Sequence, residues 1–201
     1  GANFWLSVLT DLQTRGIQDI YIAAVDGLNG FDVCPPLVKD AIQSIFPKTK
    51  VQRCVIHQIR QSLKYITWKD RKAFTKDLKK IYKAATREEA EANLVRLGET
   101  WGGKYAAAVR SWESNWEELA TFFEFPKEIR RLIYTTNAVE AYNRQLRKVI
   151  KNKSSFPTPE AVRKQLYLAT RDITKKWSAP IRNWPLILNQ LAIRFEDRFP
   201  L

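Results

Sequence analysis

The sequence has few residues that form disulfides or bind metals: its 201 residues include one histidine and two cysteines. It also contains no methionine. Cys34 and Cys54 are too few for the disulfide framework of a small secreted domain. Together with His57 they also fall short of the four Cys or His ligands that a closed zinc site needs. The chain contains no glycine-rich phosphate loop and no serine–histidine–acid arrangement. These absences argue against a secreted disulfide scaffold, a zinc module and a serine hydrolase.

Long apolar runs are missing as well. No run approaches the roughly 18 residues that a membrane span requires. The N-terminus lacks the charged-then-apolar pattern of a signal peptide. We therefore expect a cytoplasmic protein with no membrane partner. The lack of methionine and the start at Gly1 also suggest a fragment of a larger protein.

The chain has a strong excess of positive charge, with a formal net charge of +13. Residues 57–83 hold nine Lys/Arg against two acids, and residues 140–176 hold ten against three. The intervening residues 84–139 have seven bases and nine acids. Two basic blocks around a mildly acidic middle indicate a polyanionic partner such as DNA. The alternative is a pair of solubilising faces.

The first quarter of the sequence alternates between helix and strand patterns. Residues 3–15 predict a helix that Gly16 ends. The apolar run at residues 19–26 predicts a strand covered on both faces, as in parallel sheets. Pro35 and Pro36 open a second helix, and Val51–Ile56 predicts a second strand. This order favours an α/β fold with a mostly parallel sheet.

After His57 the strand pattern stops and residues 58–133 predict helices. Thr86 and Glu89 form a capping box for a helix that runs to Trp101, where Gly102–Gly103 is expected to break it. An aromatic-rich helix follows, whose rings recur at helical spacing and therefore indicate core rather than base-stacking groups. Thr158 and Pro159 predict the N-cap and first residue of a later helix.

Two acids are candidates for a functional site. Asp26 ends the first strand, where site residues gather in open α/β sheets, although it equally fits a turn. Glu140 lies in the predicted helix Tyr134–Lys153, on one face with Asn137, Arg144 and Arg147. It is either half of a helix salt bridge, which the spacing favours, or a metal ligand beside a phosphate path. A two-metal phosphoryl-transfer site needs more than two acids.

The pair Cys54 and His57 has C-x-x-H spacing. Since zinc lacks further ligands here, a buried cysteine with a capping or hydrogen-bonding histidine is the better local interpretation.

Three stretches together resemble the mutator-type transposases of bacterial insertion sequences. They are FPKTKVQRCVIHQIRQSLKYITWKDRK, SWESNWEELATFFEFPKEIRRLIYTTNAVEAYNRQLRKVIK and KKWSAPIRNW. The resemblance runs along essentially the whole chain and implies a DDE transposase, with a ribonuclease-H-like core interrupted by an all-helical insertion. It implies core at residues 1–57, insertion at 58–133, and core-completing helices at 134–201. The 113 residues between Asp26 and Glu140, mostly of helical pattern, agree with such an insertion.

The resemblance also assigns roles. Asp26 would be the second catalytic acid and Glu140 the third, holding Mg²⁺ or Mn²⁺, and Cys54 with His57 would match the family's C-x-x-H pair. The DNA contacts are expected along the Glu140 helix, at Asn137, Asn143, Arg144, Arg147, Lys148 and Lys151. The partners would be transposon-end and target DNA, and a further copy of the protein in a homo-oligomer, at least a dimer, near the nucleoid.

The sequence departs from the family pattern in three places. The segment between Gly30 and Phe46 looks longer than usual by several residues. The family's first aspartate lies on a strand upstream of anything present, so we expect the isolated chain to be inactive. Where the family often has Glu-Ser-Leu-Asn, this chain has Glu140-Ala141-Tyr142-Asn143. The alternative function is a non-catalytic, transposase-derived DNA-binding or interaction module.

Overall fold

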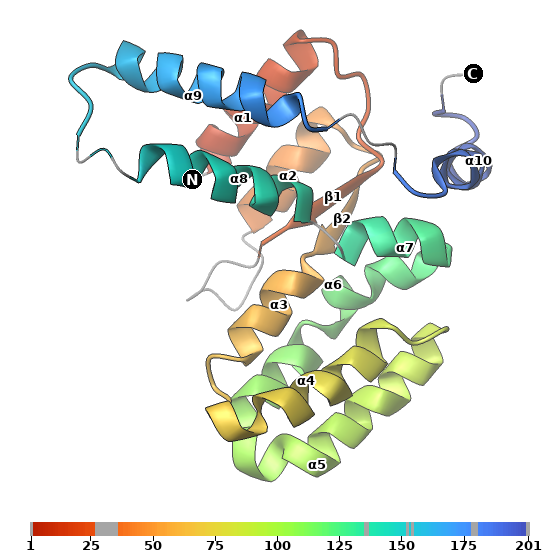
Figure 1. Cartoon of the computed structure of the whole chain (residues 1–201). Coiled ribbons are helices and arrows are strands. Elements are labelled where there is room, and N and C mark those ends of the chain that lie inside the picture. Colours follow the sequence, from red (N-terminus) through yellow and green to blue (C-terminus); the bar gives the residue numbers. More distant parts are fainter. Residues whose placement is uncertain are drawn as a thin grey trace. The chain divides into compact units, whose positions relative to one another are not determined.

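A computed structural model describes residues 2–26, 36–134, 137–151, 153, 155–177 and 181–199. The chain forms two compact units, one of residues 1–134 with 190–201 and one of residues 135–189. Helices dominate both, and a small parallel sheet lies in the first (Figure 1). The expected α/β class with dominant helix content is confirmed at this level. The ribonuclease-H-like identity and the three-part division stay predictions.

The elements of the first unit follow one another as helix, strand, helix, strand and then helices only. They are α1 (Ala2–Thr14), β1 (Ile22–Val25), α2 (Pro36–Ile45), β2 (Lys50–Arg53), α3 (Val55–Ser62), α4 (Trp68–Tyr82), α5 (Arg87–Ser114), α6 (Trp116–Ala120), the 3₁₀ helix η1 (Thr121–Glu124) and α7 (Lys127–Tyr134). The second unit contains α8 (Asn137–Ile150) and α9 (Pro159–Thr174), and α10 (Trp184–Arg194) crosses back into the first. Among the described residues, no helix is long and apolar enough to cross a membrane.

The two strands pair in parallel, with Ile22 opposite Lys50 and Val25 opposite Arg53. A hydrophobic cluster joins α1 and α2 to the sheet. Its buried members are Leu9, Ala41, Ile42 and Phe46, against which Ala23, Val25 and Val51 pack. The fully buried Gln52 side chain donates to the Leu119 carbonyl of α6 at 3.0 Å, which connects β2 to the helical part of the unit.

The helical part of the first unit has its own aromatic and aliphatic core. Its most buried side chains include Phe74 and Leu78 of α4 and Trp112 of α5, each at most 1% exposed. These side chains let α4 and α5 pack along each other (Figure 1). The predicted core role of the Trp112 ring is confirmed. The predicted Thr86 cap is present, because Glu89 N donates to Thr86 Oγ1 at 3.2 Å. The Glu89 carboxylate accepts in return from Ala85 N at 2.8 Å, one residue before the N-cap.

Two boundaries predicted from the sequence are wrong. Val55 and Ile56 do not continue the second strand, because β2 ends at Arg53 and Cys54 is the N-cap of α3. The break predicted at Gly102–Gly103 is displaced: both glycines lie within α5, and the interruption of the helix comes two residues later.

The interruption of α5 lies instead at Tyr105, whose φ of −132° and ψ of 47° are not helical. The Tyr105 hydroxyl donates to the Asp70 carboxylate at 2.6 Å and lies 2.7 Å from Thr67 Oγ1. These contacts hold the side chain against the start of α4, so the kink follows the tertiary contact rather than the glycines.

Arg198 connects the C-terminal segment to the residues that precede β1 through several hydrogen bonds. Arg198 donates to both carboxylate oxygens of Asp19 at 2.7 Å each, and to the carbonyls of Lys48 at 2.9 Å and Ile20 at 3.1 Å. Its guanidinium also lies 5.2 Å from the Tyr21 ring centroid. The hydrogen bond from Arg198 lowers the pKa of Asp19. A charge-assisted, bidentate pair of this kind is among the stronger polar contacts in proteins.

Replacing Arg198 with alanine should therefore lower the free energy of unfolding by about 3 kcal/mol, since it leaves the half-buried Asp19 without its cation. The pKa of Asp19 is lowered from its ordinary 3.8 in the folded state, so this stabilisation is present above that value and is lost as the pH falls through the folded pKa. Urea denaturation at neutral and strongly acidic pH would measure both effects. Arg194→Ala, which removes an exposed pair with Glu124 at 3.6 Å, is the control and should cost under about 1 kcal/mol. Equal losses in both variants would contradict the proposed role of Arg198.

Candidate functional site

The candidate site begins at the carboxyl end of β1, where Asp26 directly follows the strand. Cys54 N donates to the Val25 carbonyl at 2.8 Å, which continues the parallel pairing one step beyond the strands. Because the carboxyl ends of parallel strands meet at one edge, Asp26 and the start of α3 are brought together there. The Asp26 side chain is 43% exposed and accessible to a ligand.

His57 completes this edge of the sheet. The Cys54 side chain is buried at the N-cap of α3, and His57 follows in the first helical turn. Its Nε2 lies 3.5 Å from Asp26 Oδ2, within ion-pair range though long for a hydrogen bond. The C-x-x-H spacing thus places one residue in the core and the other against the candidate acid.

The donor set at this edge fits one part of a hard-metal site. Mg²⁺ and Mn²⁺ prefer carboxylate oxygens, which Asp26 offers, whereas an imidazole suits softer metals such as zinc. Within the described residues, no group of three or more His, Cys, Asp or Glu side chains gathers in a way that could hold a metal. Among the described residues, Asp26 is thus a single exposed carboxylate with His57 as its neighbour, and it does not form a complete metal site there.

The second candidate acid, Glu140, lies in the first turn of α8 in the other unit. The Tyr142 hydroxyl lies 2.6 Å from Thr170 Oγ1 of α9, and its ring lies 5.8 Å from that of Trp177. Tyr142 is therefore the residue of this segment that packs against α9, and Glu140, two residues before it, is half-buried. The contacts with Thr170 and Trp177 explain structurally why tyrosine can occupy position 142, where the family often has leucine.

The predicted DNA-contacting residues of α8 are accessible. Asn143, Arg144, Arg147, Lys148 and Lys151 are all exposed. Asn137 begins the helix, and its side chain lies outside the described residues, as does Cys34. An acid in the first turn with bases in the last also suits the helix dipole, so the charges on α8 have a structural explanation beside the functional one.

The first basic block forms an ordered surface on α4. Lys72, Lys76 and Lys79 of α4 are exposed and fall within about 60° of one another around the helix axis, and the exposed Lys83 follows as the C-cap residue. These four residues are here called the lysine stripe. The core side chains Phe74 and Leu78 lie on the opposite side. No ion pair involves these four lysines among the residues that the structure describes.

The two acids of α4 make their hydrogen bonds to groups outside this stripe, although Asp77 also interacts electrostatically with Lys76. Asp70 accepts hydrogen bonds from Lys104 and Tyr105 of α5, which lower its pKa, chiefly through Lys104. Asp77 accepts from Lys80 at 2.8 Å and from the Trp101 indole at 3.0 Å. Burial opposes ionisation of Asp77, but these hydrogen bonds outweigh it and its pKa is also lowered. The positive potential of α4 is therefore concentrated on its outer face.

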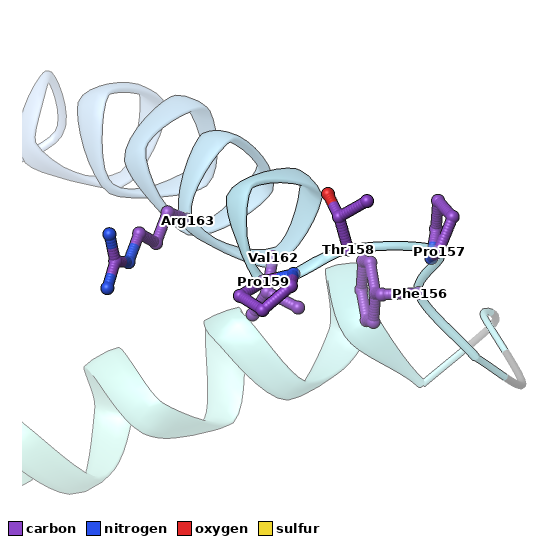
Figure 2. A pocket seen from close by; sticks show the side chains of 6 residues that line it. All are labelled: Phe156, Pro157, Thr158, Pro159, Val162 and Arg163. Atoms are coloured by element: carbon purple, nitrogen blue, oxygen red, sulfur yellow. The ribbon is translucent and has the colours of Figure 1, made fainter.

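A hollow in the second unit is a weaker candidate. It has a volume of about 520 Å³ and lies where the chain enters α9. It is lined by Phe156, Pro157, Thr158, Pro159, Val162 and Arg163. Figure 2 shows Arg163 directed away from the aromatic and proline side chains. The Thr158 hydroxyl is already used as the N-cap, accepting from Ala161 N at 3.2 Å. With no acid, histidine or cysteine in its wall, the hollow offers no catalytic group.

Sequence reasoning missed two features of this site. It predicted a buried Cys54 with a capping or hydrogen-bonding His57, and Cys54 is indeed buried, but it did not anticipate that His57 also lies against Asp26. The signal was available, because both residues closely follow adjacent parallel strands. It also treated residues 57–83 as a block, although the spacing of the lysines in α4 already predicts a single stripe.

Comparison with known proteins gives consistent matches along the chain. The model of the family described as "Transposase, Mutator family" matches residues 1–180. The chain is 44% identical over 99% of its length to a probable transposase for an ISRM3-like insertion sequence element of Sinorhizobium fredii. It is 43% identical to the ISRM3 transposase of Rhizobium meliloti and 33% identical to a probable insertion-sequence transposase of Corynebacterium diphtheriae. It spans 48% of the length of each of the first two and 62% of the third.

Proposed function

Since the chain belongs to the Mutator family of transposases, we propose that it forms part of the catalytic region of an enzyme that cuts and joins DNA during transposition. In this reaction water attacks a phosphodiester at the element's end and releases a 3′-hydroxyl. That hydroxyl then attacks a phosphodiester of target DNA and displaces the 3′-oxygen of the target strand. The relatives are about twice as long as this chain, so the proposal concerns the complete protein.

The observation that supports the proposal most is the position of Asp26. An exposed carboxylate lies at the carboxyl end of a parallel strand, at the position where the family resemblance expects the second catalytic acid. Asp26 and Glu140 would hold Mg²⁺ or Mn²⁺ together with an aspartate from outside this chain. The metal, when bound, would lower the pKa of the attacking water and stabilise the leaving oxygen.

The other residues would position the acids and the substrate. His57, 3.5 Å from Asp26, would limit the orientations of that carboxylate. Arg144, Arg147, Lys148 and Lys151 of α8 would contact phosphates beside Glu140, with Asn137 and Asn143 as further hydrogen-bonding groups. The lysine stripe of α4 would hold DNA flanking the cut site.

Cleavage of labelled DNA that contains an element end tests the proposal. We expect the complete transposase to nick this DNA and transfer the new 3′-end only when Mg²⁺ or Mn²⁺ is present. Excess EDTA should abolish both steps and leave salt-sensitive DNA binding in place. Nicking that persists in EDTA would contradict a metal-dependent DDE mechanism.

One observation favours a second candidate function, a DNA-binding module without catalysis. The lysine stripe, which makes no ion pair among the described residues, needs no metal to attract DNA. DNA binding by the complete protein with no nicking under any metal condition would support this alternative. Homo-oligomerisation and a location beside the nucleoid follow from the proposed function and stay predictions.

A further inference from the structure

Trp68, the first residue of α4, is the most exposed large apolar side chain among the described residues, at 84%. Two other tryptophans of this unit, Trp112 and Trp116, are at most 8% exposed, and Trp5 of α1 is 43% exposed. A tryptophan side chain has roughly 150–250 Å² of surface to bury, so this one leaves a wide aromatic face in water. Exposure alone does not identify a partner, but the neighbours of Trp68 do.

The ring is flanked by an arginine that is itself held in place. The Arg71 guanidinium lies over the Trp68 ring, 5.7 Å from its centroid. Arg71 Nε also donates to the Ile66 carbonyl at 3.2 Å, which fixes the position of the cation. The cation attracts the electron-rich ring face and limits its rotation. Because the ring is still 84% exposed, most of its surface remains available for stacking.

The surroundings of the ring are cationic. Lys64, Lys69 and Lys72 are all exposed near Trp68 in the sequence, and Lys72 follows it by one helical turn. The nearest acid in the sequence, Asp70, accepts hydrogen bonds from Lys104 and Tyr105 and also interacts electrostatically with Lys69, so the cations near the ring outnumber it. Trp68 therefore stands at the head of the lysine stripe. An aromatic face at the end of a row of cations matches a ligand that combines flat rings with regularly spaced phosphates.

We propose that Trp68, with Arg71 beside it, stacks on an unpaired base of a DNA strand whose phosphates lie along the lysine stripe. In an intact duplex the faces of the bases are covered by their neighbours, so an external ring reaches one only where the stack is opened. At a nick, bulge or single-stranded end a base face is already exposed, so no free energy is needed to open the stack. The inference rests on the proposed function only in requiring that the protein binds DNA.

The experiment uses the complete transposase and two short duplexes of the same arbitrary sequence. One contains 2-aminopurine in a base pair, and the other contains it as an unpaired bulge. Fluorescence anisotropy gives the affinity for each, and quenching of 2-aminopurine reports stacking. The variants are Trp68→Ala, Trp68→Phe and the control Phe4→Ala, which removes a 62% exposed aromatic from α1, a helix without Lys or Arg.

We expect the unchanged protein and Phe4→Ala to prefer the bulged duplex by about tenfold and to quench its fluorophore. Trp68→Ala should lose the preference and the quenching without changing the salt dependence, and Trp68→Phe should retain part of both. If Trp68→Ala keeps the full preference while binding still depends on the lysine stripe, the stacking role is overturned and the proposed function stands. If no form binds DNA, the proposed function fails and this inference fails with it.

Discussion

Asp26→Asn in the complete transposase should reduce strand cleavage by about a thousandfold or more while leaving DNA affinity nearly unchanged. The physical reason is the loss of one negative charge where the proposed site would hold a divalent cation. Asparagine has almost the same shape and still offers one oxygen near His57, so the variant changes charge more than packing. The Asp26 side chain is 43% exposed at a strand end, which limits any effect on folding.

Glu140→Gln tests whether the other acid of this chain is also needed for cleavage, because Glu140 is the second acid that this chain would supply. Cleavage should again fall by about a thousandfold if several carboxylates must act together. Asp40→Asn on α2 and Glu160→Gln on α9 are matched controls, since both are exposed acids on helices. Both controls should retain activity. Retained cleavage in Asp26→Asn would refute the assigned ligand, and retained cleavage in Glu140→Gln alone would leave the helix ion pair as the explanation of that residue.

The part of the fold that local patterns determine could be predicted from the sequence. The run at residues 19–26 contains β1, and the caps of Thr86 and Thr158 are present because a hydroxyl there satisfies backbone N–H groups that the helix leaves unpaired. The helix boundary that was predicted wrongly depends on contacts between helices. Each glycine costs a helix only about 1 kcal/mol. Packing of α5 on α4 outweighs the Gly102–Gly103 pair, and the kink occurs where Tyr105 bonds to Asp70.

The same limit applies to the candidate site. Asp26 was a candidate because a carboxylate at the end of a buried-strand pattern is informative by itself. The contact with His57 depends on the parallel register of two strands, which no single segment contains. The tryptophans illustrate the point further, because Trp68 and Trp112 both fit a helix yet are 84% and 1% exposed. Aromatic spacing indicates a helix, and only the packing of α4 on α5 decides which ring is left in solvent.

Replacing the whole lysine stripe, Lys72, Lys76, Lys79 and Lys83, with glutamine should weaken DNA binding more than any other surface change in this chain. If each lysine neutralises one phosphate of duplex DNA, the slope of log affinity against log salt should become shallower by about 3.6. A fourfold rise in salt would then weaken the unchanged protein about 150-fold more than the variant. Titrations at several salt concentrations measure this difference directly.

A variant with the same loss of charge elsewhere separates the stripe from a general effect of net charge. Lys39, Lys48, Arg110 and Lys127 are exposed bases on other parts of the first unit, and replacing all four with glutamine also lowers the net charge by about four. If phosphates lie along α4, this variant should keep nearly the full salt dependence, because distant charges are screened within about 10 Å. Equal changes of slope in both variants would mean that DNA affinity depends only on the overall excess of positive charge. The pairing of Asp70 and Asp77 with groups other than the stripe would then serve the packing of α4 on α5 alone.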